Sequence, residues 1–271
     1  MASSKTISDT DSIKTDTISI RVTRDAKDIE AAQRLRYQVF YEEFAAKPNS
    51  EMALSRLDFD DFDDYADHLI VVDHARDDKI IGTYRLLQNE AAKKIGQFYS
   101  SDEYDLTPLL TSNHNLLELG RSCVMPEYRT KQVMNLLWEG IAGYITDHKI
   151  DIMFGCASLH STDIKSISRP LSYLHHYHLA PKEICPRALK GCYINMDIIP
   201  KDEFEAKRGF NDLPPLIKGY LRAGANVGDG AFIDRQFNTT DVCIVMDTRN
   251  VTDRYRKHYE RKLQKDMPGK S

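Results

Sequence analysis

The feature of this sequence that most constrains the fold is a run of three elements between residues 116 and 157. Residues 116–124 (LLELGRSCV) have the composition of a β-strand and end before Pro126. Apolar residues then recur every three or four positions over 131–148, which predicts an amphipathic helix. Residues 151–157 (DIMFGCA) are almost continuously apolar, which is typical of a strand covered on both faces. We therefore expect a sheet with helices packed on it.

The rest of the pattern places this unit in one α/β (α+β) domain with a mixed central sheet and helices on both faces. The helix after Asp25, which we expect to be its N-cap, is one further element. Other strands are predicted at 18–22, 68–73, 79–87, 191–198 and 241–247, and other helices at 164–178 and 216–223. Residues 47–66 have no period and predict a long ordered loop or lid.

Three regions are expected along the chain. Residues 1–16 are rich in Ser, Thr, Asp and Lys and predict a mobile lead-in, 17–250 form the domain, and 251–271 form a basic amphipathic tail. In the tail, apolar residues spaced by four lie among Lys and Arg side chains, which suits either an anionic bilayer surface or a disordered or packed tail. The polar first 17 residues and the lack of a run of about 18 apolar residues favour a cytoplasmic protein, either free or peripheral at the inner face of the membrane.

Composition excludes several classes of function. With 41% hydrophobic and 29% charged residues the chain is in the globular range. Its net charge of -4, without basic runs that alternate with aromatic residues, argues against a nucleic-acid partner. Five cysteines without CxxC spacing predict reduced thiols rather than disulfides or a metal site. The histidines at 175, 176 and 178 are expected to pack and cap rather than to bind zinc, so no metal site is predicted.

The first element pair resembles part of a known fold. ELGRSCV at 118–124, MPEYR at 125–129 and the helix after them resemble the fourth strand and following helix of the GNAT acyltransferases, in which the strand splays and the helix N-terminus receives the acyl donor. Members of that fold commonly have glycines at this turn, where backbone N–H groups hold the pyrophosphate of coenzyme A. Here residues 129–134 are RTKQVM, and the side chains crowd that approach. An acyl chain on carrier-protein phosphopantetheine is therefore favoured over coenzyme A as the donor.

A closer resemblance covers about 210 residues, from 35 to 247. Nine blocks in order resemble the bacterial ornithine N-acyltransferases: LRYQVFYEE, DHLIVVD, GTYRLL, FYSSDEYDL, ELGRSCV, MFGCAS, YLHHYHLAP, PPLIKGYLRAGANVGDGAF and FNTTDVCIVMD. The resemblance implies transfer of a 3-hydroxyacyl group from acyl carrier protein to the α-amine of ornithine, giving lyso-ornithine lipid, with no metal or organic cofactor. A weaker resemblance reaches the acyl-homoserine-lactone synthases, but their tryptophan between the first two blocks is missing, since the only tryptophan here is Trp138.

The resemblance suggests two catalytic residues on the strand at 116–124. Glu118 is expected to accept the proton of the attacking amine, directly or through a water; alternatively it only pairs with Arg121. Arg121 lies three residues further and points to the opposite side of the strand unless a bulge intervenes. With a bulge it could hold Glu118 or bind the substrate carboxylate; a plain salt bridge is the alternative.

Substrate-binding residues are expected around the aspartate-rich stretch 58–67. Asp60 and Asp63 could receive the second ammonium of ornithine, and the alternative is a solvated acidic loop. Arg36 and Arg85 are expected to order this loop or to position the acyl group, with a structural ion pair as the alternative.

Four basic residues are expected to receive the acidic surface of acyl carrier protein, although solvated helix faces would explain them equally well: Arg129, Lys131, Lys218 and Arg222. Two other functions stay open at this point. One is an N-acyltransferase for another amino acid such as glutamine, glycine or lysine. The other is a non-catalytic protein that binds acyl carrier protein or a membrane surface.

Overall fold

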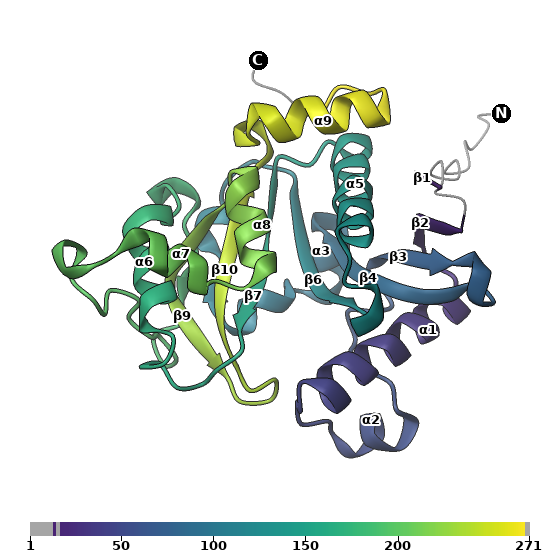
Figure 1. Ribbon diagram of the computed structural model, residues 1–271, viewed down its shortest axis with the longest axis horizontal. Helices are drawn as coiled ribbons and strands as arrows, with labels where there is room; N and C mark the ends of the chain where they lie inside the picture. Colours follow the sequence, from purple (N-terminus) through teal and green to yellow (C-terminus); the bar gives the residue numbers. More distant parts are fainter. Residues whose placement is uncertain (1–12, 15–16, 269–271) are drawn as a thin grey trace.

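The computed structural model describes residues 13–14 and 17–268, and in these residues the strands form one mixed sheet (Figure 1). The order across the sheet is β1-β2-β3-β4-β6-β7-β10-β9-β8-β5. The strands are β1 (Ile13–Lys14), β2 (Ile18–Thr23), β3 (Asp67–Asp73), β4 (Lys79–Gln88), β5 (Tyr104–Asp105), β6 (Leu116–Val124), β7 (Ile152–Leu159), β8 (Arg187–Ala188), β9 (Asn226–Asp234) and β10 (Thr239–Asp247). Neighbours are antiparallel except for β6–β7 and β8–β9, which are parallel. The predicted mixed sheet is confirmed.

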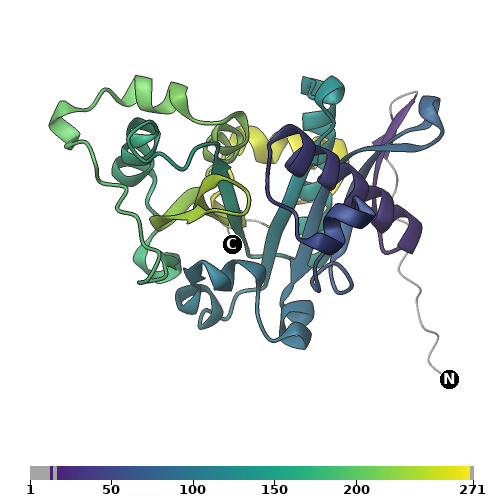
Figure 2. The ribbon, with the colours of Figure 1, turned by 90° about the horizontal axis from the view of Figure 1, so that it is seen from below.

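Helices cover both faces of the sheet. They are α1 (Ala26–Tyr37), α2 (Ser50–Ser55), α3 (Asn89–Ile95), α4 (Thr107–Leu110), α5 (Lys131–His148), α6 (Ser168–His178), α7 (Ala206–Asp212), α8 (Pro215–Ala223) and α9 (Asp253–Leu263). A π-helical segment, Gln38–Glu43, continues α1. The purple and blue helices α1 and α2 lie at one end of the sheet, and the green helices α6 and α7 lie at the other end (Figures 1 and 2).

The buried strand β3 explains why the sheet is covered on both faces. Leu69 and Val71 pack with side chains of α5, whereas Ile70 and Val72, which alternate with them, pack with side chains of α1. Each of these four side chains is at most 2% exposed. Because successive side chains of a strand point to opposite faces, a continuous apolar run needs a helix on each side.

Helices α1 and α5 begin where the sequence predicts. The Asp25 carboxylate accepts a hydrogen bond from the backbone N–H of Lys27 at 2.9 Å, and Thr130 caps α5. α5 lies close against the sheet at Gly140, where a Cβ atom would lie 2.6 Å from the side chain of Ile20. The predicted helix over 131–148 and strand over 116–124 are both confirmed.

Two predicted elements differ from the structure. Residues 191–198 are not a strand, because the predicted pairing is reduced to one bridge between Ile194 and Ala231. The Asn195 side chain accepts a hydrogen bond from the backbone N–H of Asp197 at 2.9 Å, which turns the chain there. In addition, the predicted loop 47–66 contains the short helix α2, capped by Asn49.

Strand β9 is absent from the sequence prediction because two glycines interrupt its pattern. The structure needs both of them. A Cβ at Gly228 would lie 2.7 Å from the carbonyl oxygen of Pro186, and one at Gly230 would lie 2.3 Å from the ring of Tyr193. Gly230 also has a φ of +84°. These glycines therefore lie within β9 at the positions where Pro186 and Tyr193 pack directly against its backbone.

The C-terminal helix α9 packs on α5 (Figure 1). Its apolar side chains, including Tyr259 and Leu263, form a small cluster with Ala142 and Trp138. The C-terminal tail is therefore packed on the domain, which was one of the expected alternatives. The apolar face of α9 that would contact a bilayer is covered by α5. No helix among the described residues has the length and hydropathy required to cross a bilayer. Of the expected lead-in, residues 1–12 and 15–16 lie outside the described residues, whereas 13–14 pair with β2.

Candidate active site

The central feature of the site is the point at which the parallel strands β6 and β7 separate. Within these two strands the pairing ends at Glu118 and Phe154. The next residue of β7, Gly155, has no room for a side chain, because a Cβ atom would lie 2.1 Å from the carbonyl oxygen of Leu119. β7 meanwhile stays paired with β10 along its length. The splayed strand pair expected from the sequence is therefore present.

A bulge in β6 lies next to this separation. Gly120 pairs with Arg85 and Cys123 pairs with Thr83, so β6 uses one more residue than β4 over the same stretch. Arg121, inside the bulge, has a φ of 50°, in the left-handed region that non-glycine residues rarely adopt. The bulge that the sequence analysis required to bring Arg121 into the site is thus present.

A narrow cavity of about 30 Å³ lies between the separating strands. Its wall includes the bulge residues Arg121 and Ser122, Gly155, and two tyrosines from different elements, Tyr84 of β4 and Tyr220 of α8. The hydroxyl oxygens of the two tyrosines are 3.4 Å apart. Burial raises the pKa of both phenols, so both remain protonated and can donate a hydrogen bond.

A closed ring of ion pairs forms one side of the site. Each arginine of the ring contacts two aspartates and each aspartate contacts two arginines, in the order Arg36, Asp58, Arg121, Asp60, Arg85 and Asp63. Five of the six contacts have N···O distances from 2.5 to 3.2 Å, and the sixth joins Arg85 to Asp60. Three positive and three negative charges cancel in a region with little solvent access.

The ring determines the charge state of its aspartates. Burial opposes the ionisation of Asp58, but the charges of Arg121 and Arg36 outweigh it and hold the pKa of Asp58 below its ordinary value. In the same way, burial opposes ionisation of Asp63, and Arg36 and Arg85 keep its pKa low. Asp63 also accepts a hydrogen bond from the side-chain amide of Gln33 at 2.9 Å. The acidic loop is thus buried and paired with arginines, and an ammonium could reach Asp60 or Asp63 only by competing with them.

Tyr99 connects the ring to Glu118. The guanidinium carbons of Arg121 and Arg85 lie 4.6 and 5.3 Å from the centre of the Tyr99 ring. The backbone N–H of Tyr99 donates to Glu118 Oε2 at 2.8 Å. Tyr99 therefore contacts β6 through Arg121 and Glu118, and contacts β4 through Arg85.

Glu118 is 3% exposed and accepts its hydrogen bonds from the turn at Tyr99–Asp102. Besides the bond from Tyr99, its Oε1 accepts from the backbone N–H of Ser100 at 2.7 Å and from the Ser100 hydroxyl at 2.5 Å. Burial raises the pKa of Glu118, and these hydrogen bonds only partly oppose the shift. The partners of Glu118 are thus in the turn and not at Arg121, so the simple Glu118–Arg121 pair considered from the sequence is not formed.

A second acidic group lies nearby, and the sequence analysis missed it. One oxygen from each of Glu103, Asp234 and Asp241 lies within 4.8 Å of the other two. Glu103 follows the turn that binds Glu118, and the two aspartates come from β9 and β10. The β9–β10 hairpin brings Asp234 and Asp241 together, and Glu103 joins them from the turn before β5, a long-range approach that no local sequence pattern shows.

Cys123 of β6 is buried and does not have the environment of a nucleophile. Burial raises the pKa of its thiol to about 12. The thiolate is the reactive form, so this cysteine is inert near neutral pH.

The four residues expected to bind a carrier protein lie on the N-terminal side of α5 and on α8. Arg129 makes a two-bond ion pair with Glu43, with both N···O distances at 2.6 Å. Lys131 and Arg222 are exposed, and Lys218 donates to a backbone carbonyl oxygen of α7 at 2.7 Å. Lys131 and Arg222 are thus exposed to a partner, although the Arg222 guanidinium also lies 5.3 Å from the centre of the Phe210 ring, and Arg129 and Lys218 have polar contacts within the chain.

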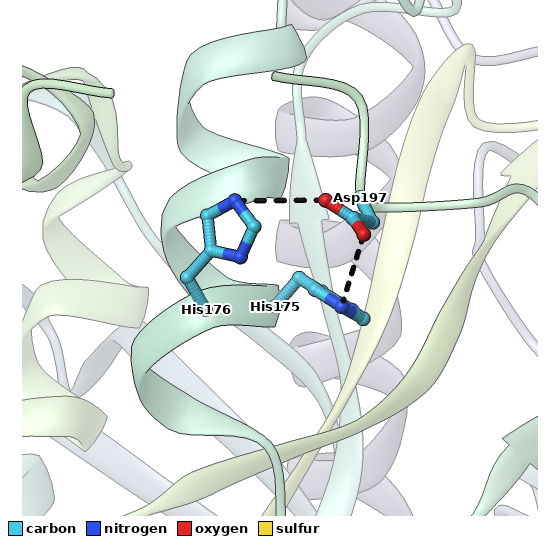
Figure 3. A group of neighbouring side chains, drawn as sticks. All are labelled: His175, His176 and Asp197. Atoms are coloured by element: carbon cyan, nitrogen blue, oxygen red, sulfur yellow. Dashed lines mark ion pairs between the residues drawn. The ribbon is translucent and has the colours of Figure 1, made fainter. Parts of the chain in front are cut away.

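The histidines of α6 form a clamp with a neighbouring loop (Figure 3). His175 and His176 approach the two carboxylate oxygens of Asp197 at 3.8 and 3.6 Å. The Nε2 atom of His176 also lies 2.8 Å from the carbonyl oxygen of Ile199, so it carries the hydrogen and has no lone pair for a metal. The two histidines therefore connect α6 to the loop that carries Asp197 and Ile199.

Four similarities to known proteins bear on the chain. Residues 35–139 match the family model of the acetyltransferase (GNAT) domain. The chain is 45% identical over 249 residues to the L-ornithine N(alpha)-acyltransferase of Rhodobacter capsulatus, covering 90% of this chain and 95% of that protein. The enzyme of the same name from Brucella abortus is 45% identical, covering 89% of this chain and 88% of that protein. A solved coenzyme A-dependent acyl-homoserine lactone synthase aligns with a TM-score of 0.47 at 11% identity, over 90% of this chain and 86% of the other.

Proposed function

The chain belongs to the family of L-ornithine N(alpha)-acyltransferases, and from this premise we propose that it joins an acyl group to the α-amine of L-ornithine. The observation that carries the proposal is the high identity to these enzymes over nearly the whole chain. Amide formation from a thioester needs space for the thioester, a proton acceptor and hydrogen-bond donors. We assign these to the gap between β6 and β7, to the buried carboxylate of Glu118, and to the two tyrosines that line the cavity.

The donor in this proposal is a 3-hydroxyacyl chain on the phosphopantetheine of acyl carrier protein. β6 and β7 part beyond Glu118 and Phe154, and we place the pantetheine arm between the separated strands. The turn at 129–134 has no glycine to admit a pyrophosphate, which favours the carrier protein over coenzyme A. The exposed residues Lys131 and Arg222 would meet the acidic surface of the carrier.

Bond formation requires the amine of ornithine to lose a proton. Its nitrogen lone pair attacks the thioester carbonyl carbon, the new C–N bond forms, and the C–S bond then breaks. We assign the released proton to Glu118, whose Oε2 accepts one hydrogen bond and keeps a lone pair for another. The pKa of Glu118, raised by burial, makes it a stronger base than an exposed glutamate.

The leaving thiolate needs a proton and the oxyanion needs hydrogen-bond donors. Tyr84 and Tyr220 line the cavity, and we assign their hydroxyls as hydrogen-bond donors to the leaving sulfur, which then takes its proton from solvent. Backbone N–H groups of β6 beyond Glu118, where β7 has moved away, would hold the oxyanion. In this scheme Arg121, held by two aspartates, positions the bulged backbone.

The experiment is product identification with purified protein. Incubation with a 3-hydroxyacyl carrier protein and ornithine should give a 3-hydroxyacyl amide on the α-nitrogen, detected by mass spectrometry, and the matching coenzyme A thioester should react more slowly. Equal amounts of glutamine, glycine and lysine serve as competing acceptors. Absence of an ornithine amide from about pH 7 to about pH 9, or preference for another acceptor, would refute the proposal.

A further inference from the structure

The three carboxylates of Glu103, Asp234 and Asp241 form a group, here called the acidic trio, that the catalytic scheme does not use. Glu103 and Asp241 are 5% and 6% exposed, so both are more than nine-tenths buried. Each has one buried carboxylate oxygen that lacks a hydrogen-bond partner, Oε2 of Glu103 and Oδ1 of Asp241. A buried, unpaired carboxylate oxygen is costly, so its presence in a group of three points to a positively charged ligand.

Asp234 has a different part in the trio. Its Oδ1 accepts hydrogen bonds from the backbone N–H groups of Gln236 and Phe237, at 2.7 and 2.9 Å, in the turn between β9 and β10. The turn fixes this carboxylate in place. Asp234 therefore adds a negative charge to the trio from a fixed position. Glu103 and Asp241 supply the oxygens that have no hydrogen-bond partner.

The trio lies beside the proposed reaction centre. The backbone N–H of Glu103 donates to the carbonyl oxygen of Ser100 at 3.1 Å, and Ser100 is the residue whose N–H and hydroxyl bind Glu118. Cys156 follows Gly155, the residue at which β7 separates from β6. The sulfur of Cys156 lies 3.5 Å from the hydroxyl oxygen of Ser100. Glu118 and Glu103 are close enough for the charge of one to raise the pKa of the other. Ser100 thus connects the proton acceptor to the trio.

The charge balance of the site favours a cation at this position. The ring of three arginines and three aspartates is neutral, and among the described residues neither Glu103 nor Asp241 forms an ion pair. Burial, followed by the charge of Asp241, raises the pKa of Glu103, and burial raises the pKa of Asp241. The trio therefore resists full ionisation on its own, and a cationic ligand would favour the ionised carboxylates.

We propose that the acidic trio binds the side-chain ammonium of the amino-acid substrate and so selects ornithine over amino acids that lack a terminal amine. This inference rests on the proposed function. An ammonium has three N–H donors and no acceptor, which matches three convergent carboxylate oxygens. Placing the side-chain ammonium in the trio would leave the α-amine free to face Glu118 and the thioester.

The test compares two acceptors in two variants. Norvaline has the same carbon chain as ornithine but ends in a methyl group. For the wild-type protein, kcat/KM should be at least about 100-fold higher with ornithine than with norvaline. Glu103→Gln and Asp241→Asn should each lower kcat/KM for ornithine by about 30-fold or more and leave the value for norvaline within about 2-fold. Glu203→Gln and Asp202→Asn, the same changes at exposed positions of one turn, are the matched controls.

A measurement on the unaltered protein keeps the proposal open to refutation if a variant does not fold. Dicyclohexylcarbodiimide labels buried protonated carboxyl groups, and peptide mass spectrometry locates the label. Ornithine should slow labelling of Glu103 or Asp241, and norvaline should not. Labelling that ornithine leaves unchanged would overturn the proposal.

Other outcomes separate this inference from the proposed function. If the wild-type protein acylates no amino acid, the proposed function fails. If it acylates ornithine but the folded variants discriminate against norvaline as the wild type does, only the acidic trio proposal fails. Loss of discrimination with a chelator and recovery with Mg²⁺ or Ca²⁺ would assign the trio to a metal ion and would also overturn it.

Discussion

Replacement of Asp63 by asparagine should destabilise the whole domain, although the two side chains have nearly the same shape. The carboxylate of Asp63 contacts Arg36 at 2.5 Å and Arg85 at 3.1 Å and is 2% exposed. In Asp63→Asn, both arginines stay buried and each loses one of its two anionic partners. Breaking a buried ion pair by removing one member costs about 3 to 5 kcal/mol. That is a large part of a typical total stability of about 5 to 15 kcal/mol.

The assay is equilibrium unfolding in urea, followed by circular dichroism, with the unfolding midpoint and slope fitted for each variant. Asp64→Asn is the matched control, because Asp64 belongs to the same loop but is exposed. We expect the control to lie within about 0.5 kcal/mol of the wild type. A free-energy loss below about 1 kcal/mol for Asp63→Asn, with an unchanged slope, would refute the argument that the ring holds the loop.

The pH dependence of the unfolding free energy is a second test of the ion-pair ring. The pKa values of Asp58 and Asp63 are lower in the folded protein than in the unfolded chain, where an aspartate titrates near about 3.9. Their contribution is therefore complete above about pH 5 and is lost as the pH falls through the folded pKa values. Asp63→Asn should lose less stability than the wild type when the pH is lowered from about 5 to about 3. An identical loss in both proteins would contradict the assignment.

Three further predictions concern the site. Glu118→Gln should lower kcat by about 100-fold with a smaller effect on KM, and the pH–rate profile should lose its acidic limb; a retained limb would assign the proton to another group. Gly155→Ala should cost several kcal/mol in a thermal melt, because its Cβ would lie 2.1 Å from a carbonyl oxygen of Leu119; a stable, fully active variant would show that the strand separation tolerates a side chain. The double change Lys131→Glu with Arg222→Glu should raise KM for the carrier-protein thioester about 10-fold or more and leave KM for the coenzyme A thioester unchanged; equal effects on both would place the carrier elsewhere.

The strongest periodic patterns predicted their elements to within a residue or two. The strand at 116–124 and the helix at 131–148 are found with those bounds, because a strand buried on both sides and a one-sided apolar stripe are visible in local sequence. β9 was missed because its glycines, required by the approach of Pro186 and Tyr193, resemble a turn in the sequence. Close packing by distant segments is not visible in a local pattern.

The candidate site was predictable only in part, for an electrostatic reason. The sequence analysis names the aspartates at 60 and 63 and the arginines at 36, 85 and 121 one by one, and the structure brings them together, but their pairing into a closed ring depends on burial. A buried charge needs a partner, and only the fold decides which one. The acidic trio was missed because Glu103 and Asp241 are brought together across the sheet from distant parts of the chain.

The most direct measurement of the central claim is the identity of the lipid that the chain makes in cells. The protein should be expressed in a bacterial host that has no ornithine lipids, and the lipid extract should be fragmented in a mass spectrometer. We predict a new lipid with an ornithine head group joined through its α-nitrogen to a 3-hydroxyacyl chain, absent from cells that express Glu118→Gln. A new lipid with another head group, or no new lipid from soluble wild-type protein, would contradict the claim.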